Sequence, residues 1–280
     1  MSSFRLIRPE KQVSGTVFAV PHSGRAYPAA FLEQSVLSRQ AIRSSEDAWV
    51  DLLFEDVPQL GAPLLVAEAP RAFVDLNRSC DELDPALIAG LARVGINPRV
   101  SSGLGVIPRV VAGGRAIYRG KITGAEAAER LQQVWYPYHG ALDQLLAEAV
   151  ASFGQSLLID CHSMPHEAVA QVAGAPQIVL GDRFGAATDS DIMDQVEAAF
   201  QRTGLRVARN APFAGVYMVR QYGRPSVGRH AVQVEIDRAL YMDEAGLTRH
   251  GGFDELKAMM REVAAELVQI GRSDVRLAAQ

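Results

Sequence analysis

The stretch TVFAVPHSG, residues 16–24, joins an apolar run directly to a histidine and a glycine. Two later stretches have the same form, LLIDCHS at 157–163 and AVQVEID at 231–237. Short apolar runs rich in β-branched residues predict buried strands, and each of these ends in side chains that can bind a metal or transfer a proton. Ligands in open α/β sheets gather at the carboxyl ends of the strands, so we expect the three ends to form one hydrolase-like pocket.

The composition limits the class of protein. The chain has 280 residues, 48% of them hydrophobic, which is enough for a sizeable core. A net charge of -4, with 28 basic and 32 acidic residues and 7% aromatic content, argues against a nucleic-acid partner. Cys80 and Cys161 lie far apart, which indicates a reducing compartment, and we expect a cytoplasmic location. The first fifteen residues lack an apolar signal-peptide core and no run approaches the ~18 apolar residues of a membrane span, so we expect no membrane insertion.

The order of the runs predicts an α/β fold as one domain over residues 1–280, with a sheet covered by helices on both faces. The expected strands are 17–20, 64–67, 71–76, 157–160, 177–180, 216–219 and 231–236. The expected helices are 46–57, 123–145 with a break or kink at Pro137, 189–203 and 253–270. Residues 95–120, rich in Gly, Pro and Arg, are too long for an ordinary connection and form a candidate binding loop or lid.

Two histidines are candidate metal ligands, because His22 and His162 each follow a predicted strand. A turn histidine bonded to a backbone carbonyl is the alternative for either one, and the paired context favours a metal. Catalytic zinc takes three protein ligands and one water, so a third ligand is needed, either a carboxylate or another histidine. Glu46 and Asp47 could each supply it, although a carboxylate in the first turn of a helix also stabilises the helix dipole. Spacing alone leaves this choice open.

Glu235 is a candidate general base. It is predicted in mid-strand among apolar neighbours, where an ionised carboxylate is costly unless it is paired or bound. Burial there would raise its pKa toward the range that a base acting on water requires. A structural salt bridge to Arg238 is the alternative. His166 and His230 remain reserve candidates.

Arginines indicate an acidic substrate. Arg78 stands beside Asn77 at the end of a predicted strand, and a planar guanidinium next to an amide can bind a carboxylate through two parallel hydrogen bonds. Arg71, Arg220 and Arg224 are weaker candidates, since each could equally face solvent. An ion pair to an acidic side chain is the alternative for any of them.

Five motifs together resemble, in this order, the N-formylglutamate amidohydrolases: PHSG at 21–24, SEDAWVD at 45–51, DLNR at 75–78, DCHSMP at 160–165 and QVEIDR at 233–238. Weaker matches occur at 105–109, 117–118, 136–139, 181–183 and 240–243, so the resemblance spans nearly the whole chain. That family is related to the zinc carboxypeptidases and the aspartoacylases. The resemblance implies a mixed, largely parallel central sheet flanked by helices, like that of the zinc carboxypeptidases.

The resemblance also implies one Zn²⁺ per chain, bound by His22, His162 and Asp47, although the same ligands accept other divalent ions. In the related carboxypeptidases a glutamate ligand stands three residues after the first histidine, and here that position is Arg25. The resemblance places the carboxylate ligand in the 45–51 stretch, and Asp47 is our prediction.

The implied roles of the remaining residues are a general base for Glu235, a carboxylate clamp for Arg78 and Asn77, and oxyanion stabilisation for Arg71. The implied reaction is hydrolysis of N-formyl-L-glutamate to formate and L-glutamate, a late step of histidine degradation. A deacylase for another small N-acyl amino acid or a small carboxypeptidase would use the same chemistry. A non-catalytic metal- or ligand-binding protein on this fold would be indifferent to loss of Glu235. Nothing in the sequence indicates an oligomeric state.

Overall fold

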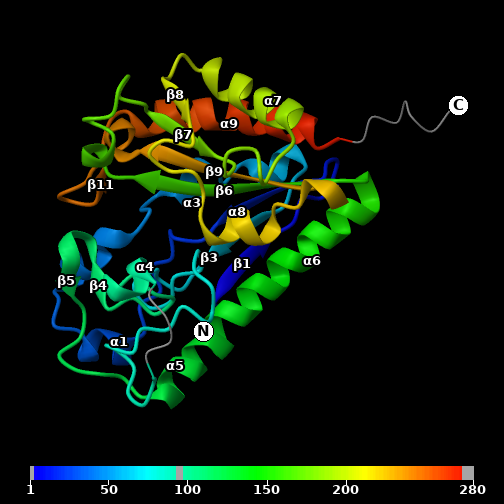
Figure 1. Ribbon diagram of the computed structural model, residues 1–280. Helices are drawn as coiled ribbons and strands as arrows, with labels where there is room; N and C mark the ends of the chain where they lie inside the picture. The colour runs from blue at the N-terminus through cyan, green and yellow to red at the C-terminus, as the bar shows by residue number, and fades with distance from the viewer. Residues whose placement is uncertain (1–2, 93–96, 273–280) are drawn as a thin grey trace, which may run out of the picture. The chain divides into compact units, whose positions relative to one another are not determined.

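The computed structural model describes residues 3–92 and 97–272 (Figure 1). Its main feature is a seven-stranded sheet with the order β1-β3-β2-β6-β9-β7-β8. The strands are β1 (Phe4–Ile7), β2 (Thr16–Val20), β3 (Leu64–Ala67), β6 (Ser156–Met164), β7 (Ile178–Gly181), β8 (Val207–Arg209) and β9 (Arg229–Asp237). β6 pairs in parallel with both β2 and β9, whereas β7 pairs antiparallel with β9 and parallel with β8. The predicted mixed, largely parallel sheet is confirmed.

The chain divides into two compact units. The first comprises Met1–Arg5, Pro21–Ala48 and Val66–Ala141, and the second comprises Leu6–Val20, Trp49–Leu65 and Leu142–Gln280. The chain passes from one unit to the other within β1 and again within β3. The expectation of a single domain over 1–280 stays a prediction.

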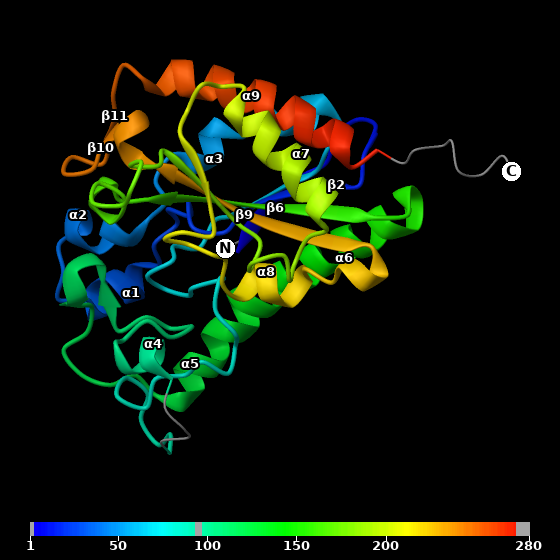
Figure 2. The same ribbon diagram turned by 45° about the horizontal axis from the view of Figure 1, so that its top comes forward.

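The second unit buries its strands between helices. Every residue of β2 and β6 is buried, as expected for strands covered on both faces. Helices α7 (Ser190–Gln201) and α9 (Phe253–Ile270) lie side by side on one face, and α8 (Tyr217–Tyr222) lies on the other (Figures 1 and 2). α9 has the bounds predicted from its apolar periodicity, and it also packs against the short helix α3 (Val50–Leu53). A small antiparallel pair, β10 (Met242–Asp243) and β11 (Thr248–Arg249), follows β9.

The first unit consists of short elements around a separate core. Its helices are α1 (Ala29–Gln34), α2 (Arg39–Ile42), α4 (Pro98–Ser101) and α5 (Gly124–Arg130), and β4 (Val110–Val111) pairs with β5 (Arg115–Ala116). The buried members of the core are Phe31, Ile42, Ala72, Val111 and Ile117. In the predicted loop, residues 95–96 lie outside the described residues, and 97–120 contain α4 and the β4–β5 pair. A lid function for this segment stays a prediction.

The prediction of a helix over 46–57 is wrong. Helix α3 begins only at Val50, and Trp49 has a left-handed φ of 69° that interrupts any helix across it. Tertiary contacts fix this conformation, because the Asp47 N–H donates to the His22 carbonyl and the Trp49 indole donates to the Leu247 carbonyl. Glu46 and Asp47 therefore do not lie in the first turn of a helix.

Two predicted strands are also wrong. Residues 71–76 form turns, since the Phe73 and Val74 N–H groups donate to the Pro70 carbonyl. Residues 216–219 enter helix α8, where the Arg220 N–H donates to the Val216 carbonyl. Both runs are apolar and short, and periodicity cannot separate a buried strand from a buried helix or turn at that length.

The predicted helix at 123–145 begins as α5 and continues as α6 (Tyr136–Phe153), beyond its predicted end. A π-helical turn, Leu131–Trp135, joins them and ends two residues before Pro137. Proline lacks the amide donor that a regular helix would use there. No helix in the described part of the chain has the length and apolar character needed to cross a bilayer.

Candidate active site

The pairing of β6 and β9 places the candidate base beside a candidate ligand. In this parallel register His162 lies opposite Glu235, and Asp160 lies opposite Gln233. Alternate residues of a strand share one face, so these four side chains project from the same side of the sheet. Gln233 Nε2 donates to Glu235 Oε1 at 2.8 Å, and Glu235 is only 9% exposed. The Glu235 carboxylate is thus held in a defined position near the carboxyl ends of two central strands.

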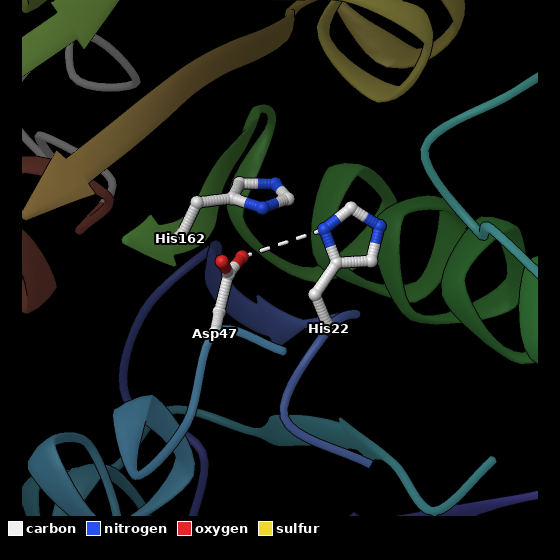
Figure 3. A group of neighbouring side chains, drawn as sticks. All are labelled: His22, Asp47 and His162. Carbon is white, nitrogen blue, oxygen red and sulfur yellow. Dashed lines mark ion pairs between the residues drawn. The ribbon is translucent and has the colours of Figure 1, made fainter. Parts of the chain in front are cut away.

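His22 follows the end of β2, whose Ala19 pairs with Asp160 of β6. Its imidazole lies between two carboxylates of the first unit. Nε2 is 2.8 Å from Asp75 Oδ1, and Nδ1 is 3.4 Å from Asp47 Oδ2 (Figure 3). Because Nε2 faces Asp75, Nδ1 is the ring nitrogen directed at the Asp47 carboxylate.

Asp75 is a buried acid with several donors around it. Its Oδ1 also accepts the Asn77 N–H at 2.9 Å, and its Oδ2 accepts Arg71 Nε at 3.1 Å. Burial alone would raise the pKa of Asp75, but Arg71, His22 and Arg78 outweigh burial and hold the pKa well below its usual range. Asp75 is therefore ionised at neutral pH.

Backbone contacts fix the turn that carries His22. The His22 carbonyl accepts the Asp47 N–H at 3.0 Å, and Ser23 Oγ donates to the Asp47 carbonyl at 2.6 Å. Gly24 is required by packing, since a Cβ at this position would lie 2.1 Å from the Ala69 carbonyl oxygen. These contacts set the separation of the His22 and Asp47 side chains.

The two candidate carboxylate ligands have different partners in the structure. Glu46 accepts the Tyr27 hydroxyl at 2.7 Å and is bound by Arg43 through Nε and Nη2, with Nη2 at 2.9 Å. That carboxylate therefore stabilises its own loop. Asp47 is the one of the two whose oxygen approaches His22.

The three predicted ligands come together. One potential ligand atom from each of His22, Asp47 and His162 lies within 4.8 Å of the others, and all three residues are buried (Figure 3). His162 Nε2 lies 2.9 Å from Asp160 Oδ1, just as His22 Nε2 lies beside Asp75. Two imidazoles and a carboxylate are a donor set that suits zinc, and a carboxylate behind each imidazole is usual for metal-binding histidines. The residues thus fit a mononuclear divalent metal site.

Comparison with known proteins shows the family of the chain. The family model for N-formylglutamate amidohydrolase matches residues 14–242. The chain belongs to the N-formylglutamate amidohydrolase family. Within this family it is 31% identical to an N-formylglutamate deformylase from Pseudomonas aeruginosa, over 91% of this chain and 93% of the relative. An N-formylglutamate deformylase from Pseudomonas putida is 29% identical over 81% of this chain and 82% of the relative.

Solved structures give the same result. The crystal structure of N-formylglutamate amidohydrolase from Ralstonia eutropha JMP134 aligns with a TM-score of 0.90 and 35% identity, over 97% of this chain and all of that one. A protein from Agrobacterium tumefaciens, the gene product Atu2144, shares the fold with a TM-score of 0.68 at 16% identity, over 96% of each chain. The predicted resemblance to the amidohydrolase family is confirmed, whereas the likeness to zinc carboxypeptidases stays a prediction.

The predicted carboxylate clamp is hydrogen-bonded within the first unit. Arg78 is 6% exposed, and it donates through Nε to the Leu104 carbonyl at 3.0 Å and through Nη1 to the Asn77 carbonyl at 3.1 Å. With Arg71 on the other oxygen of Asp75, the three predicted residues gather around one buried acid. Sequence reasoning assigned no role to Asp75, although its position in the DLNR motif was a signal that could have identified it.

The two other predicted arginines lie elsewhere in the second unit. Arg220 is exposed on α8, where its guanidinium lies 5.8 Å from the ring centre of Tyr217. Arg224 is exposed, and its backbone forms an isolated antiparallel β-bridge with Arg229. Arg229 lies at the amino end of β9, the opposite end of the strand from Glu235. Their role in substrate binding stays a prediction that this placement does not support.

Of the reserve histidines, His166 is largely exposed with Nδ1 2.9 Å from Asp237, whose hydrogen bond raises the pKa of His166. His230 is buried near the amino end of β9, where burial lowers its pKa. Neither belongs to the metal-ligand group found among the described residues.

Proposed function

We propose that this chain hydrolyses the amide bond of an N-acyl acidic amino acid, with N-formyl-L-glutamate as the preferred substrate and formate and L-glutamate as products. The observation that carries the proposal is the β6–β9 register, which sets Glu235 opposite His162 in a member of the N-formylglutamate amidohydrolase family. The relatives named N-formylglutamate deformylase support the choice of substrate.

We assign His22, Asp47 and His162 as the ligands of one divalent ion, with zinc as the first choice. Asp75 and Asp160 orient the two imidazoles through their contacts with Nε2. A bound ion would lower the pKa of a water molecule and polarise the carbonyl oxygen of the substrate.

Glu235 acts as the general base and then as the general acid. Its carboxylate takes a proton from the attacking water and returns the proton to the leaving nitrogen as the C–N bond breaks. The hydrogen bond from Gln233 to Oε1 fixes the rotamer of this side chain, so that the proton is accepted at a defined place. Such positioning lowers the entropic cost of the proton transfers.

Arg78 and Asn77 bind a substrate carboxylate, and Arg71 stabilises the charge that develops on the carbonyl oxygen. Two hydrogen bonds from Arg78 to backbone carbonyls fix the plane of its guanidinium before substrate arrives. We further propose that residues 1–280 work as one catalytic domain in the cytoplasm, on a small N-acyl amino acid from histidine degradation.

Release of formate, acetate or free amino acids by purified protein tests this function, with the bound metal measured in the same sample. N-formyl-L-glutamate, N-formyl-L-aspartate, N-acetyl-L-glutamate, N-acetyl-L-aspartate and a C-terminal dipeptide form the panel. Preference for N-formyl-L-glutamate supports the proposal. Preference for another member of the panel would assign a different deacylase or a carboxypeptidase, and metal binding without any turnover would indicate a binding protein.

A further inference from the structure

The backbone of Arg99 is hydrogen-bonded to Leu104, the residue whose carbonyl accepts a hydrogen bond from Arg78. It lies in the short helix α4, where the Asn97 side chain accepts the Arg99 N–H at 3.0 Å. The Arg99 carbonyl accepts the Leu104 N–H at 2.8 Å, and the Leu104 carbonyl accepts Arg78 Nε at 3.0 Å. Two consecutive hydrogen bonds therefore connect Arg99 to the guanidinium of the proposed clamp.

Further contacts hold this segment in place. The Val106 carbonyl accepts the Asp75 N–H at 2.8 Å, and the Val106 N–H donates to the Glu82 carbonyl at 2.9 Å. Gly105 allows the close approach, because a Cβ there would lie 2.4 Å from the Glu82 carbonyl oxygen. Residues 99–106 are thus fixed against residues 75–82, and the position of Arg99 relative to Arg78 is defined.

The charged groups that act on Arg99 are two guanidiniums and two carboxylates, so the set is net positive once the charge of Arg99 itself is included. Partial burial of the guanidinium makes the largest contribution to lowering the pKa of Arg99, and Arg78 and Arg71 lower it further, while Glu82 and Asp75 act in the opposite direction. The local set contains three guanidiniums and two carboxylates, and one of these carboxylates already accepts from His22 and Arg71. Like charges repel, so an anion bound beside these guanidiniums would relieve the repulsion.

Two neighbouring arginines of the same segment already have protein partners. Arg109 Nε donates to Asp84 Oδ2 at 2.9 Å, and Arg115 Nη2 donates to Ser44 Oγ at 2.7 Å. Within residues 3–92 and 97–272, by contrast, no acceptor is hydrogen-bonded to the Arg99 guanidinium, and the residue is exposed. Arg99 therefore has the charge and the position to bind an incoming anion.

We propose that Arg99 is a specificity-determining residue that binds the side-chain carboxylate of the acidic substrate, while Arg78 binds the other carboxylate. This inference rests on the proposed function, and it explains why an acidic amino acid is selected over a neutral one of the same size. A guanidinium matches a carboxylate with two parallel hydrogen bonds, which a neutral amide side chain does not reproduce.

The test compares N-formyl-L-glutamate with N-formyl-L-glutamine, which has nearly the same shape without the second charge. In Arg99→Gln we expect kcat/KM for N-formyl-L-glutamate to fall roughly 10- to 100-fold while that for N-formyl-L-glutamine stays unchanged. Arg99→Lys keeps the charge without the planar fork and should give an intermediate loss. Arg119→Gln, an exposed arginine of the same segment, is the matched control and should behave like wild type.

Equal losses on both substrates, or no loss on either, would overturn the role of Arg99 while leaving the proposed function intact. If the wild type hydrolyses neither substrate, the proposed function fails first, and glutarate binding measured by calorimetry still decides the inference. Weaker binding of glutarate to Arg99→Gln than to wild type supports the anion site. Equal binding to both proteins, or none to wild type, refutes it.

Discussion

Oδ1 of Asp75 lies 2.8 Å from Nε2 of His22, and both side chains are almost completely buried. The same carboxylate accepts the Asn77 N–H and Arg71 Nε, so that one acid fixes a proposed metal ligand and two residues proposed to contact substrate. A residue that supplies no ligand atom therefore controls the geometry of the site.

Replacing Asp75 with Asn should weaken metal binding about 10- to 100-fold, because the imidazole of His22 loses the charged partner that orients it. Chelator competition on purified protein measures the affinity. Asp84→Asn is the matched control, since Asp84 is equally buried and pairs with Arg109 rather than with a proposed ligand. Equal metal affinity in Asp75→Asn and wild type would contradict the orienting role.

Metal removal should lower thermal stability, because an ion that binds only the folded state stabilises it. With free zinc at a hundred times its Kd, the predicted gain is about 2.7 kcal/mol. Scanning calorimetry with and without zinc would show this as a rise in Tm. His22→Ala should lose the zinc-dependent rise, whereas His230→Ala, a change at a buried histidine outside the cluster, should keep it. A zinc-dependent rise that survives in His22→Ala would count against the assigned ligands.

His139 predicts a pH dependence of stability. Burial lowers its pKa to about 4, against the smaller opposing effect of the hydrogen bond with the Leu76 carbonyl at 3.0 Å. The unfolded chain has a histidine pKa of about 6.5, so the unfolded state binds the proton first as the pH falls. The stability contributed by neutral His139 is complete above about pH 6.5 and is lost as the pH falls to about 4, a change of about 3 kcal/mol.

Denaturant unfolding of the metal-free protein between pH 7 and pH 4 checks this. His139→Gln keeps a donor near Leu76 and removes the titration, so its free energy of unfolding should fall less steeply with acid than that of wild type. Parallel pH dependences in the two proteins would show that His139 does not carry the effect.

Because Leu76 immediately precedes Asn77, the variant should also raise the KM for N-formyl-L-glutamate more than it lowers kcat.

Several features of the fold could be predicted because they depend on local pattern. The apolar runs of β2, β6 and β9 and the amphipathic period of α9 are visible in the sequence, and their strand ends indicated where His22 and His162 would meet. The short apolar run at 216–219 gave the wrong element, since its conformation depends on packing against the sheet rather than on period.

The finer features of the site depend on contacts between distant residues. Glu46 and Asp47 are adjacent and chemically similar, and they differ in the structure because Tyr27 and Arg43 bind the first. Arg99 is one of several arginines in its segment, and only the hydrogen bonds through Leu104 place it by Arg78. No spacing rule in the sequence contains that information.

Glu235→Gln tests the central claim most directly. Formate release from N-formyl-L-glutamate is measured for wild type and variant, with the metal content of both determined in the same samples. The account predicts that wild type releases formate and that the variant, with equal metal and similar KM, is slower by about 10²- to 10⁴-fold. Undiminished turnover by Glu235→Gln at equal metal content, or no formate from metal-loaded wild type, would contradict it.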